Sequence, residues 1–447
     1  MKTTFQIRLG RQSAGIWFDI GLLLWLIVGA YLEIPLPMGA NYIPAIMLVL
    51  AAPVLMIRFL PTIVKSDIMF IGGFFLITAM SVIASPGWEF LGDKLKSSLQ
   101  ICFSCCLMLL ILKLCAKTGP KALYWCFCFS SVTIAIGLLL EFFSPALKQL
   151  FNNIREVLYA AENTGFNYSL YDNLARDISM VGRDRASFLT TEPSAAAEGV
   201  FILSNCCLIL RRDFVAVVLF AFANFAAFFT TGSPVAIASL GGGLLTLATF
   251  DLWRKPMILI LGCVLLCIGF AIPQARDIVA GQIERFQGGV DELGEQSIYS
   301  RIGFPYMKAL PSMVERAPIF GVGVGGKKVL VEWSDDARAS LTDEFSVGTN
   351  ALVRIFLFYG LLGGVLVFLI VYIYLKRLNI KHLALLAGIW CFYANTTGAL
   401  EAPRFWTYNA FLIGAFYCAA RQPALRRIRK LNNAPPAGFK AMPQACV

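Results

Sequence analysis

Two glutamates, Glu192 and Glu198, stand at the head of an apolar run in the stretch "GRDRASFLTTEPSAAAEG", residues 182–199, and Arg183 and Arg185 precede them. A carboxylate inside a membrane span costs roughly 2.5–3.5 kcal/mol on insertion scales unless it faces partners or water. Glu198 is therefore expected to face the interior of a helix bundle. Two interpretations stay open: a salt bridge to Arg183 or Arg185, or a site that binds or activates a polar substrate.

A glycine-rich string forms a second group of candidates. From Gly321 the sequence reads G-V-G-V-G-G-K-K, which is the spacing of a phosphate loop, with Lys328 where Ser or Thr would bind magnesium. The string is followed by "VLVEWSDD" and lies in a segment expected outside the cytoplasm, so its context does not fit a nucleotide site. A glycine-rich turn beside Lys327 and Lys328 can still present N–H groups and positive charge to another anion. A plain flexible turn is the alternative.

Arginines form the third group. A guanidinium group matches phosphate through bidentate hydrogen bonds. The usual bias of basic residues toward the cytoplasm does not explain Arg354 at the mouth of a span or Arg404 in a predicted tight turn. A ring of such groups above a membrane bundle suggests an anionic head group whose apolar tail remains in lipid, and a salt bridge within a loop is the alternative for each arginine. The basic candidates for anion binding are Arg183, Arg185, Arg285, Arg301, Lys327, Lys328, Arg354 and Arg404.

Composition indicates the elements that position these residues. The chain of 447 residues is 58% hydrophobic and 15% charged, and its mean hydropathy is +0.71. Apolar runs of about 17–25 residues are long enough to cross a bilayer as helices, and lipid offers no partner for unpaired backbone groups. We predict an all-α polytopic membrane protein, a single bundle over residues 1–447 with about 12 transmembrane helices. The predicted spans are 15–32, 43–60, 67–84, 97–114, 121–141, 194–210, 214–230, 235–250, 256–273, 351–375, 383–400 and 405–420.

Lysines and arginines near the span ends predict the orientation. One set of short connections is rich in these residues, so that side and both termini are expected to be cytoplasmic, with residues 421–447 as a basic cytoplasmic tail. Much of the net charge of +11 is explained in this way, and the chain shows no basic folded face of the kind that nucleic acids require. The residues that carry this signal are Lys2, Arg8, Arg11, Arg58, Lys65, Lys113, Lys117, Lys121, Arg211, Arg212, Arg254, Lys255, Lys376, Arg377 and Lys381.

Two connections, 142–193 and 274–350, are far longer than turns and are expected on the periplasmic side, carrying short helices. The first contains an amphipathic helix after Ser144 and Pro145, which is expected to lie at the membrane–water boundary either as a lid over the bundle or as a gate for a lipid-linked substrate. Its predicted apolar face holds Leu147, Leu150, Phe151, Ile154, Val157 and Leu158, and its predicted polar face holds Lys148, Asn152, Arg155 and Glu156. At the end of this connection, Thr191 or Glu192 is expected to cap the helix that begins at Pro193.

The sequence predicts no metal site and no cofactor. No Cys-x-x-Cys pair is matched by a second one, and the only histidine, His382, sits beside Lys381 on the predicted cytoplasmic side. The 13 cysteines fall in the predicted spans, at their cytoplasmic edges or in the tail, so we expect no disulfide framework in the long connections.

Three stretches resemble the O-antigen polymerase and O-antigen ligase superfamily of bacterial envelopes, which includes exopolysaccharide polymerases. "GRDRASFLTTEPSAAAEG" is similar to the family's arginine-rich start of a middle span, and "YSRIGFPYMKALPSMVERAPIFGVGVGG" is similar to its external segment. "GTNALVRIFLFYGLLGG" is similar to the segment that returns to the membrane. The resemblance covers roughly residues 180–365 by motif and the rest by topology.

The resemblance implies a polymerase rather than a ligase. Ligases of the superfamily carry a histidine beside the asparagine at the position that corresponds to Thr349 and Asn350, and this chain has Thr349 there. Pro234 stands where relatives often have arginine. The implied reaction transfers a growing glycan from undecaprenyl diphosphate to the next lipid-linked unit at the periplasmic face of the bacterial inner membrane, with Asn350 among the substrate-binding residues. A ligase that moves glycan to another acceptor, and a secondary transporter, are the alternatives.

The implied chemistry needs arginines for the diphosphate leaving group and a general base for the acceptor hydroxyl. Because no external histidine exists, a carboxylate is expected to be this base: Glu192 or Glu198, with Glu344 and Glu401 as reserves. The implied partners are the undecaprenyl-diphosphate-linked oligosaccharide, the lipid bilayer, a flippase and a chain-length regulator. The apolar tail of the substrate is expected in a groove between helices.

Overall fold

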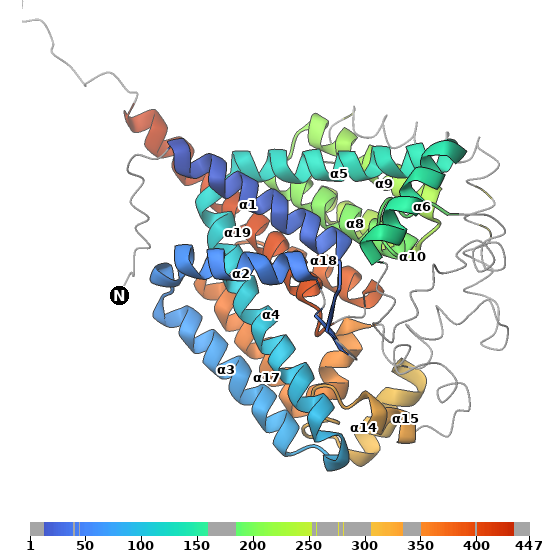
Figure 1. The fold of residues 1–447 in the computed structure, drawn as a ribbon. Helices are drawn as coiled ribbons and strands as arrows, with labels where there is room; N and C mark the ends of the chain where they lie inside the picture. Colours follow the sequence, from blue (N-terminus) through green and yellow to red (C-terminus); the bar gives the residue numbers. More distant parts are fainter. Residues whose placement is uncertain are drawn as a thin grey trace, which may run out of the picture.

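The computed structural model describes residues 13–38, 41–43, 45–159, 185–252, 305–333, 350–397 and 400–432 (Figure 1). These residues are almost entirely helical, apart from a small hairpin in which β1 (Leu36–Met38) pairs antiparallel with β2 (Asn41–Ile43). Within the described ranges, seven helices are long and apolar enough to cross a membrane, and three apolar helices are shorter. The predicted class, a polytopic helical membrane protein, is confirmed at this level.

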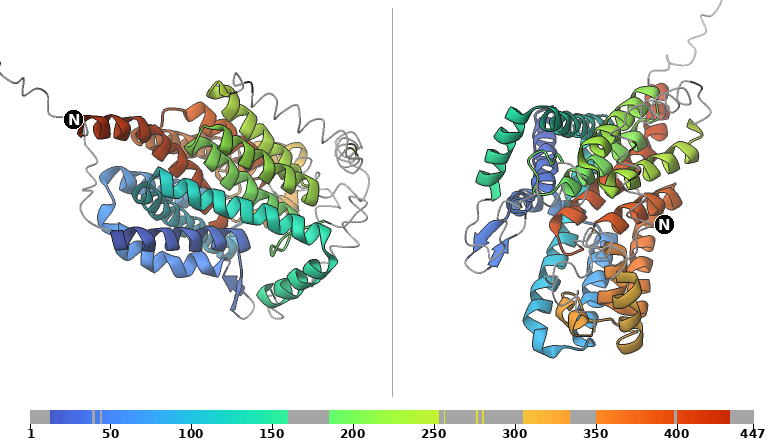
Figure 2. Two further views of the ribbon diagram at one scale, coloured as in Figure 1. Left: turned by 90° about the horizontal axis from the view of Figure 1, so that it is seen from above. Right: turned by 90° about the vertical axis from the view of Figure 1, so that its right-hand side faces the viewer.

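The first half of the chain forms a run of long helices that ends in the amphipathic helix. In order they are α1 (Ser13–Leu32), α2 (Ile46–Phe59), α3 (Lys65–Ile83), α4 (Leu91–Thr118), α5 (Pro120–Phe143) and α6 (Pro145–Tyr159). Ser144 accepts a hydrogen bond from the backbone N–H of Leu147 through its Oγ, at 3.4 Å, so α6 begins where the sequence predicts. Both views of Figure 2 show α6 at the edge of the bundle, beyond the end of α5.

The second half begins with three helices whose ends follow from single residues. They are α8 (Pro193–Leu210), α9 (Phe214–Thr231) and α10 (Pro234–Thr249). Asp213 caps α9, Ser233 caps α10, and Gly232 ends α9 in the left-handed conformation that glycine adopts without strain. The remaining described helices are α14 (Leu310–Arg316), α15 (Lys327–Trp333), α17 (Ala351–Arg377), α18 (Leu383–Thr396) and α19 (Pro403–Asn432).

Helices occupy the predicted ranges, except 256–273, which falls outside the described ranges, and several boundaries differ. Helix α4 begins at Leu91 rather than at 97, and α18 ends at Thr396 rather than at 400 because Thr397 is extended. Helix α19 continues to Asn432, into the range predicted as a basic tail.

Helices α8 and α19 form the centre of the bundle. Helix α19 packs against α1, α4, α5, α8 and α18, and α8 packs against α5, α9, α10 and α19 (Figure 1). Every residue of α8 except Ser194 is buried. Glu198 on α8 therefore faces protein on all sides, as the cost of a carboxylate in lipid requires.

The candidate residues within the described ranges gather at one end of the bundle, here called the site end, where α1, α5, α9 and α18 finish and α8, α17 and α19 begin. Backbone hydrogen bonds join these termini: Ala186 N–H donates to Thr230 O at 3.1 Å, and Ala351 N–H donates to Thr397 O at 2.8 Å. Helices begun far apart in the sequence are thus held together where their polar side chains converge.

Buried ion pairs hold the opposite end. Asp19 on α1 lies 2.5 Å from Arg58 and 3.2 Å from Lys117, and Asp67 on α3 lies 2.5 Å from Lys113. Both aspartates are buried, so each needs its cation. These pairs tie α1, α2, α3 and α4 together at the end that carries the basic connections.

Candidate functional site

A guanidinium group shared by two carboxylates forms the centre of the site. Arg404 Nη2 lies 2.9 Å from Oε2 of Glu198, and Arg404 Nη1 lies 2.8 Å from Oε2 of Glu33. The salt bridge predicted for Glu198 therefore exists, but its partner is Arg404 and not Arg185, while Arg183 lies outside the described ranges. The predicted place of Arg404 in a tight turn is wrong, because it is the second residue of α19.

Aromatic side chains enclose Glu198. A Cβ at the neighbouring Gly199 would lie 2.8 Å from the Tyr31 ring and 3.3 Å from the Tyr408 hydroxyl, so glycine is required for this close approach. The Tyr393 ring packs edge to face with that of Tyr408, with ring centroids 6.3 Å apart. Within the described ranges, Oε1 of Glu198 accepts no hydrogen bond of normal geometry. The buried carboxylate thus lies between Arg404 and the Tyr393 hydroxyl.

Glu33 was missed in the sequence, although it directly follows the predicted span 15–32. Its backbone is left-handed, with φ of 49°, which is uncommon for a residue with a side chain and turns the carboxylate toward Arg404. Burial raises the pKa of Glu33 above its usual 4.5; Arg404 lowers this pKa in part, and Glu198 raises it further. Two carboxylates thus compete for one guanidinium group.

A second ion cluster lies directly beside the first. Glu401 precedes α19 and lies 2.8 Å from Arg354 Nη1 on α17 and 3.3 Å from Lys327 Nζ on α15. Burial alone would raise the pKa of Glu401, but Lys327 and Arg354 outweigh burial and lower it to about 2. Glu401, a reserve candidate for the base, is therefore held as an anion by two cations and suits charge compensation better than proton transfer. Lys328 points to another partner, Asp93, at 3.0 Å.

Asn350 is the N-cap of α17. Its Oδ1 accepts from the backbone N–H of Val353 at 3.1 Å, and its Nδ2 donates to Oδ1 of Asn395 at 2.9 Å. The hydroxyl of Tyr306 donates to the same Asn395 oxygen at 2.8 Å. The described contacts of Asn350 are those of a helix cap that joins α17 to α18.

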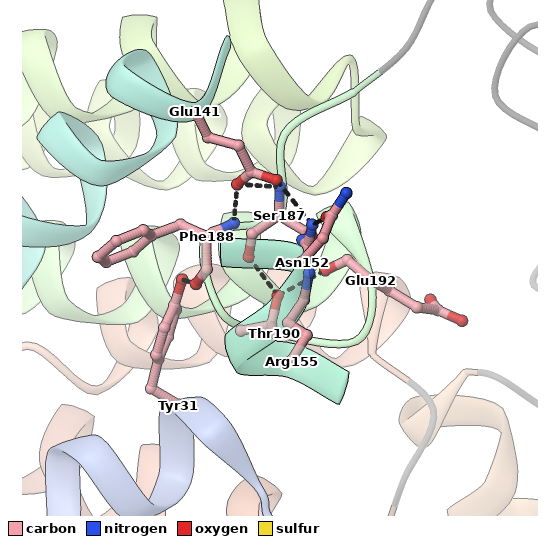
Figure 3. Close-up of polar contacts among 8 residues, drawn as sticks. All are labelled: Tyr31, Glu141, Asn152, Arg155, Ser187, Phe188, Thr190 and Glu192. Carbon is pink, nitrogen blue, oxygen red and sulfur yellow. Dashed lines mark hydrogen bonds and ion pairs between the residues drawn. The ribbon is translucent and has the colours of Figure 1, made fainter. Parts of the chain in front are cut away.

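The segment 185–192 is held by a carboxylate that the sequence did not single out. Oε2 of Glu141 accepts from the backbone N–H groups of Ser187 at 3.1 Å and Phe188 at 2.6 Å, and its Oε1 accepts from Arg155 Nη2 at 3.0 Å (Figure 3). Arg155 also contacts Ser187 and Asn152. Glu141 ends the predicted span 121–141, so the insertion cost applied to Glu198 would have identified it.

Arg155 belongs to the predicted polar face of α6, and at this position that face packs against the bundle. Arg155 is buried against Glu141, whereas the apolar side chains of Leu150 and Val157 are 49% and 80% exposed. The ion pair with Glu141 decides which face of α6 packs against the bundle. Leu150 and Val157 are left facing outward at the bundle edge, while Phe151 packs edge to face on Phe188, with ring centroids 5.3 Å apart.

Tyrosine hydroxyls fix the rest of the segment. Tyr31 donates to Phe188 O at 2.6 Å and Tyr159 donates to Leu189 O at 3.1 Å, while Phe188 and Leu189 have positive φ values of 33° and 66°. A strained conformation of this kind persists only when surrounding contacts determine it. The start of α8, and with it Glu198, is thus placed by α1, α5 and α6 together.

Glu192, one of the two residues predicted to cap α8, is its N-cap, but its side chain makes no capping hydrogen bond. Its Oε2 accepts from Ser194 Oγ at 2.9 Å. Figure 3 shows its carboxylate pointing away from Glu141 and Arg155. Glu192 therefore offers a half-buried carboxylate at the mouth of the site, whereas Glu198 offers a buried one.

The glycine-rich string packs against a break in α17. Gly360 has φ of 70°, and there the string lies against α17: Val322 N–H donates to Leu357 O at 2.9 Å and Gly323 N–H donates to Phe358 O at 3.1 Å. A Cβ at Gly321 would lie 2.2 Å from Leu357 O. The glycines are thus needed for backbone contact, and two of the N–H groups predicted to present themselves to an anion are already bonded.

An apolar cavity of about 440 Å³ lies between α3, α4, α17, α18 and α19. Leu400 and Phe405, which adjoin Glu401 and Arg404, line it at the site end, and Leu383 lines it toward the opposite end. Other lining residues are Phe74, Ile355, Phe368 and Trp390. The cavity thus lies between helices, beside both ion clusters.

The structure brings Glu198 and Arg404 together, and it places Lys327 and Arg354 on one carboxylate. Arg185 is half-buried in the segment 185–192. Arg183, Arg285, Arg301 and Glu344 lie outside the described ranges. Comparisons with protein-family models, with curated proteins and with solved structures found no match to this chain.

Proposed function

We propose that this chain is a polymerase of lipid-linked oligosaccharide units, as the sequence resemblance implies. It transfers a growing glycan from undecaprenyl diphosphate to the next unit on the same kind of carrier. The observation that carries the proposal is the position of the apolar cavity: its end at Leu400 and Phe405 adjoins the ion clusters of Glu401 and Arg404. A substrate with a long apolar tail and an anionic head group matches this arrangement.

The proposed topology is twelve spans in the bacterial inner membrane, with both termini in the cytoplasm and the connections 142–193 and 274–350 in the periplasm. The short connections at the opposite end support it, because they carry the lysines and arginines that mark a cytoplasmic side. Arg58, Lys113 and Lys117 lie at that end in ion pairs. The site end then faces the periplasm, where lipid-linked units are consumed.

In the proposed complex, the tail lies in the apolar cavity and the diphosphate lies near Lys327, Arg354 and Arg404. These cations are paired with Glu401, Glu198 and Glu33, so the diphosphate competes with carboxylates for them. A diphosphate offers more acceptor oxygens to a guanidinium group than one carboxylate does. Arg183, Arg185, Arg285 and Arg301 are further proposed contacts.

Glu198 is the proposed base, with Glu192 as the alternative. The acceptor hydroxyl oxygen attacks the anomeric carbon of the growing glycan, the bond from that carbon to the diphosphate oxygen breaks, and the diphosphate leaves with the electron pair. The hydroxyl proton passes to Oε1 of Glu198, the oxygen that Arg404 does not engage. The nearby cations stabilise the negative charge on the leaving group.

The broken helix α17 bears on the transporter alternative. Transporters use carbonyl groups at helix breaks to bind ions near the midplane. Here the carbonyl groups of Leu357 and Phe358 accept from Val322 and Gly323, so the break is closed by protein. These carbonyl groups are therefore already hydrogen-bonded at the break. This observation favours an enzyme over a transporter that binds an ion there.

The test uses purified protein in lipid nanodiscs with the lipid-linked repeat unit of the native host as the only substrate. The expected result is consumption of single units and growth of longer lipid-linked glycans without any nucleotide sugar. A ligase would leave single units unchanged and transfer glycan only when another acceptor is added. Uptake of solute into vesicles without glycan lengthening would overturn the proposal in favour of a transporter.

A deletion strain supplies the matching test in cells. Loss of the protein is expected to leave envelope glycan of single-unit length on a ladder gel, and the wild-type gene restores the ladder. Accumulation of free lipid-linked polymer in the deletion strain would contradict the proposal, because polymer would then form without this protein.

A further inference from the structure

Arg404 engages only one oxygen of each of two carboxylates. Arg404 engages Oε2 of Glu33 and Oε2 of Glu198. Among the described ranges, Oε1 of Glu198 accepts no hydrogen bond of normal geometry and Oε1 of Glu33 takes part in no ion pair. Two acceptor oxygens therefore flank a single cation at the site end.

These two oxygens differ in access. The side chain of Glu33 is 23% exposed, that of Arg404 is 16% exposed and that of Glu198 is 5% exposed. Glu33 is therefore the outer carboxylate of the pair and Glu198 the inner one. Tyr31 and Tyr408 close the inner wall through their contact with Gly199.

The backbone conformation of Glu33 directs its side chain toward Arg404. The residue has φ of 49° and its N–H donates to Gly29 O at 3.0 Å, which ends α1 and turns the side chain toward Arg404. A left-handed residue with a long side chain is uncommon and strained, and the surrounding contacts must offset the strain. A residue needed only to end the helix would be glycine or asparagine.

We propose that Glu33 binds hydroxyl groups of the acceptor sugar, and that Glu33 and Glu198 together form a sugar-hydroxyl subsite on either side of Arg404. Carboxylate oxygens accept hydrogen bonds from hydroxyl groups, and the flanking guanidinium keeps both carboxylates oriented. The outer carboxylate holds the sugar, and the inner one receives the proton of the attacking hydroxyl. This inference rests on the proposed function, because it names the acceptor half of that reaction.

The test separates binding from turnover. The probe is the free repeat-unit oligosaccharide, released from its lipid by mild acid, and binding is measured by saturation-transfer NMR on the protein in nanodiscs. Glu33→Gln is expected to weaken binding about tenfold, the loss that follows from one hydrogen bond to a charged group. In the transfer assay, the same variant is expected to raise KM for the acceptor by a similar factor at unchanged kcat.

Glu315→Gln is the matched control, since Glu315 is an exposed glutamate on α14 outside the ion clusters, and it is expected to bind like wild type. Wild-type binding by Glu33→Gln, or a lower kcat with unchanged KM, would overturn the subsite. Failure of the wild-type protein to bind the oligosaccharide would overturn it as well. Failure of the wild-type protein to consume lipid-linked units would instead overturn the proposed function. The two failures are distinguishable, because NMR measures binding of the free oligosaccharide independently of transfer. The Tm of each variant shows that the fold is retained.

Discussion

Arg404 lies 2.9 Å from Glu198, so the first turn of α19 is tied to the start of α8, the two helices at the centre of the bundle. The same arginine reaches Glu33 at the end of α1. Arg404 uses a separate nitrogen for each carboxylate, whereas a lysine would have to contact both from one ammonium nitrogen at the end of a shorter side chain.

Replacing Arg404 is therefore expected to separate the effects of charge and geometry. Arg404→Ala leaves two carboxylates without their cation, and loss of one partner from a buried ion pair costs about 3–5 kcal/mol. Arg404→Lys keeps the charge and is expected to lower the Tm of the detergent-solubilised protein by less. Equal Tm values for Arg404→Ala and wild type would show that the bridge contributes nothing to stability.

The glycines at the break in α17 give a sharp stability prediction. Gly360 has φ of 70°, and a Cβ there would lie 2.3 Å from Ile319 O. Gly360→Ala is expected to destabilise the protein by more than about 1–3 kcal/mol, since backbone strain and overpacking add. The measurement is the Tm in detergent and the amount of protein in the membrane.

Gly72→Ala is the matched control for this prediction. Gly72 lies within α3, and a Cβ there meets nothing within 4 Å. Alanine is favoured over glycine in a helix by up to about 1 kcal/mol, so this variant is expected to be neutral or slightly stabilising. A destabilised Gly72→Ala together with an unaffected Gly360→Ala would contradict the role of the glycine string.

A test at Glu141 and Arg155 can show whether their ion pair alone holds the segment 185–192, or whether the backbone hydrogen bonds to Glu141 are needed as well. Glu141 accepts from two backbone N–H groups as well as from Arg155. Exchanging the charges, with Glu141→Arg and Arg155→Glu in one chain, is therefore expected to fail, because an arginine cannot accept those N–H bonds. Hydrogen exchange in residues 185–192 should be faster in the double variant than in wild type. Full restoration of slow exchange by the double variant would show that the ion pair alone holds the segment.

Much of the fold follows from the sequence, because apolar runs of spanning length determine the helices and proline, glycine, aspartate or serine determine several ends. The burial of Glu198 also follows, since a carboxylate in lipid is costly. Its partner does not follow, because Arg404 is placed beside it only when α19 packs on α8.

Two other features could not be predicted, because their causes lie in another segment. Periodicity divides α6 into two faces, but the buried Glu141 on α5 decides that Arg155 faces the bundle. The G-V-G-V-G-G-K-K spacing suits both a phosphate loop and a close backbone approach, and only the break at Gly360 distinguishes them. Sequence spacing describes one segment, whereas both features depend on a second one.

The lowered pKa of Glu401 predicts a pH effect with a defined sign. The pKa is about 2 in the folded chain and 4.5 at its ordinary value, so Glu401 stabilises the fold above pH 4.5 and loses this contribution as the pH falls toward 2. Glu401→Gln is expected to lower the Tm at pH 7, and its difference from wild type should shrink as the pH is lowered below 4.5. A difference that stays constant between pH 7 and pH 3 would show that Lys327 and Arg354 do not stabilise the ionised carboxylate.

The last prediction separates the two candidate bases. Glu198 is buried with one oxygen on Arg404, whereas Glu192 is half-buried and accepts from Ser194. Glu198→Gln keeps the shape and an oxygen for Arg404 but cannot take up the hydroxyl proton, and loss of a positioned base lowers rates by about 10²–10⁴-fold. In the deletion strain it is expected to give single-unit glycan at normal protein abundance, while Glu192→Gln still makes a ladder. Low abundance of the Glu198→Gln protein in the membrane would instead point to a structural role for the ion pair with Arg404. Full-length glycan from Glu198→Gln together with single units from Glu192→Gln would move the base to the mouth of the site.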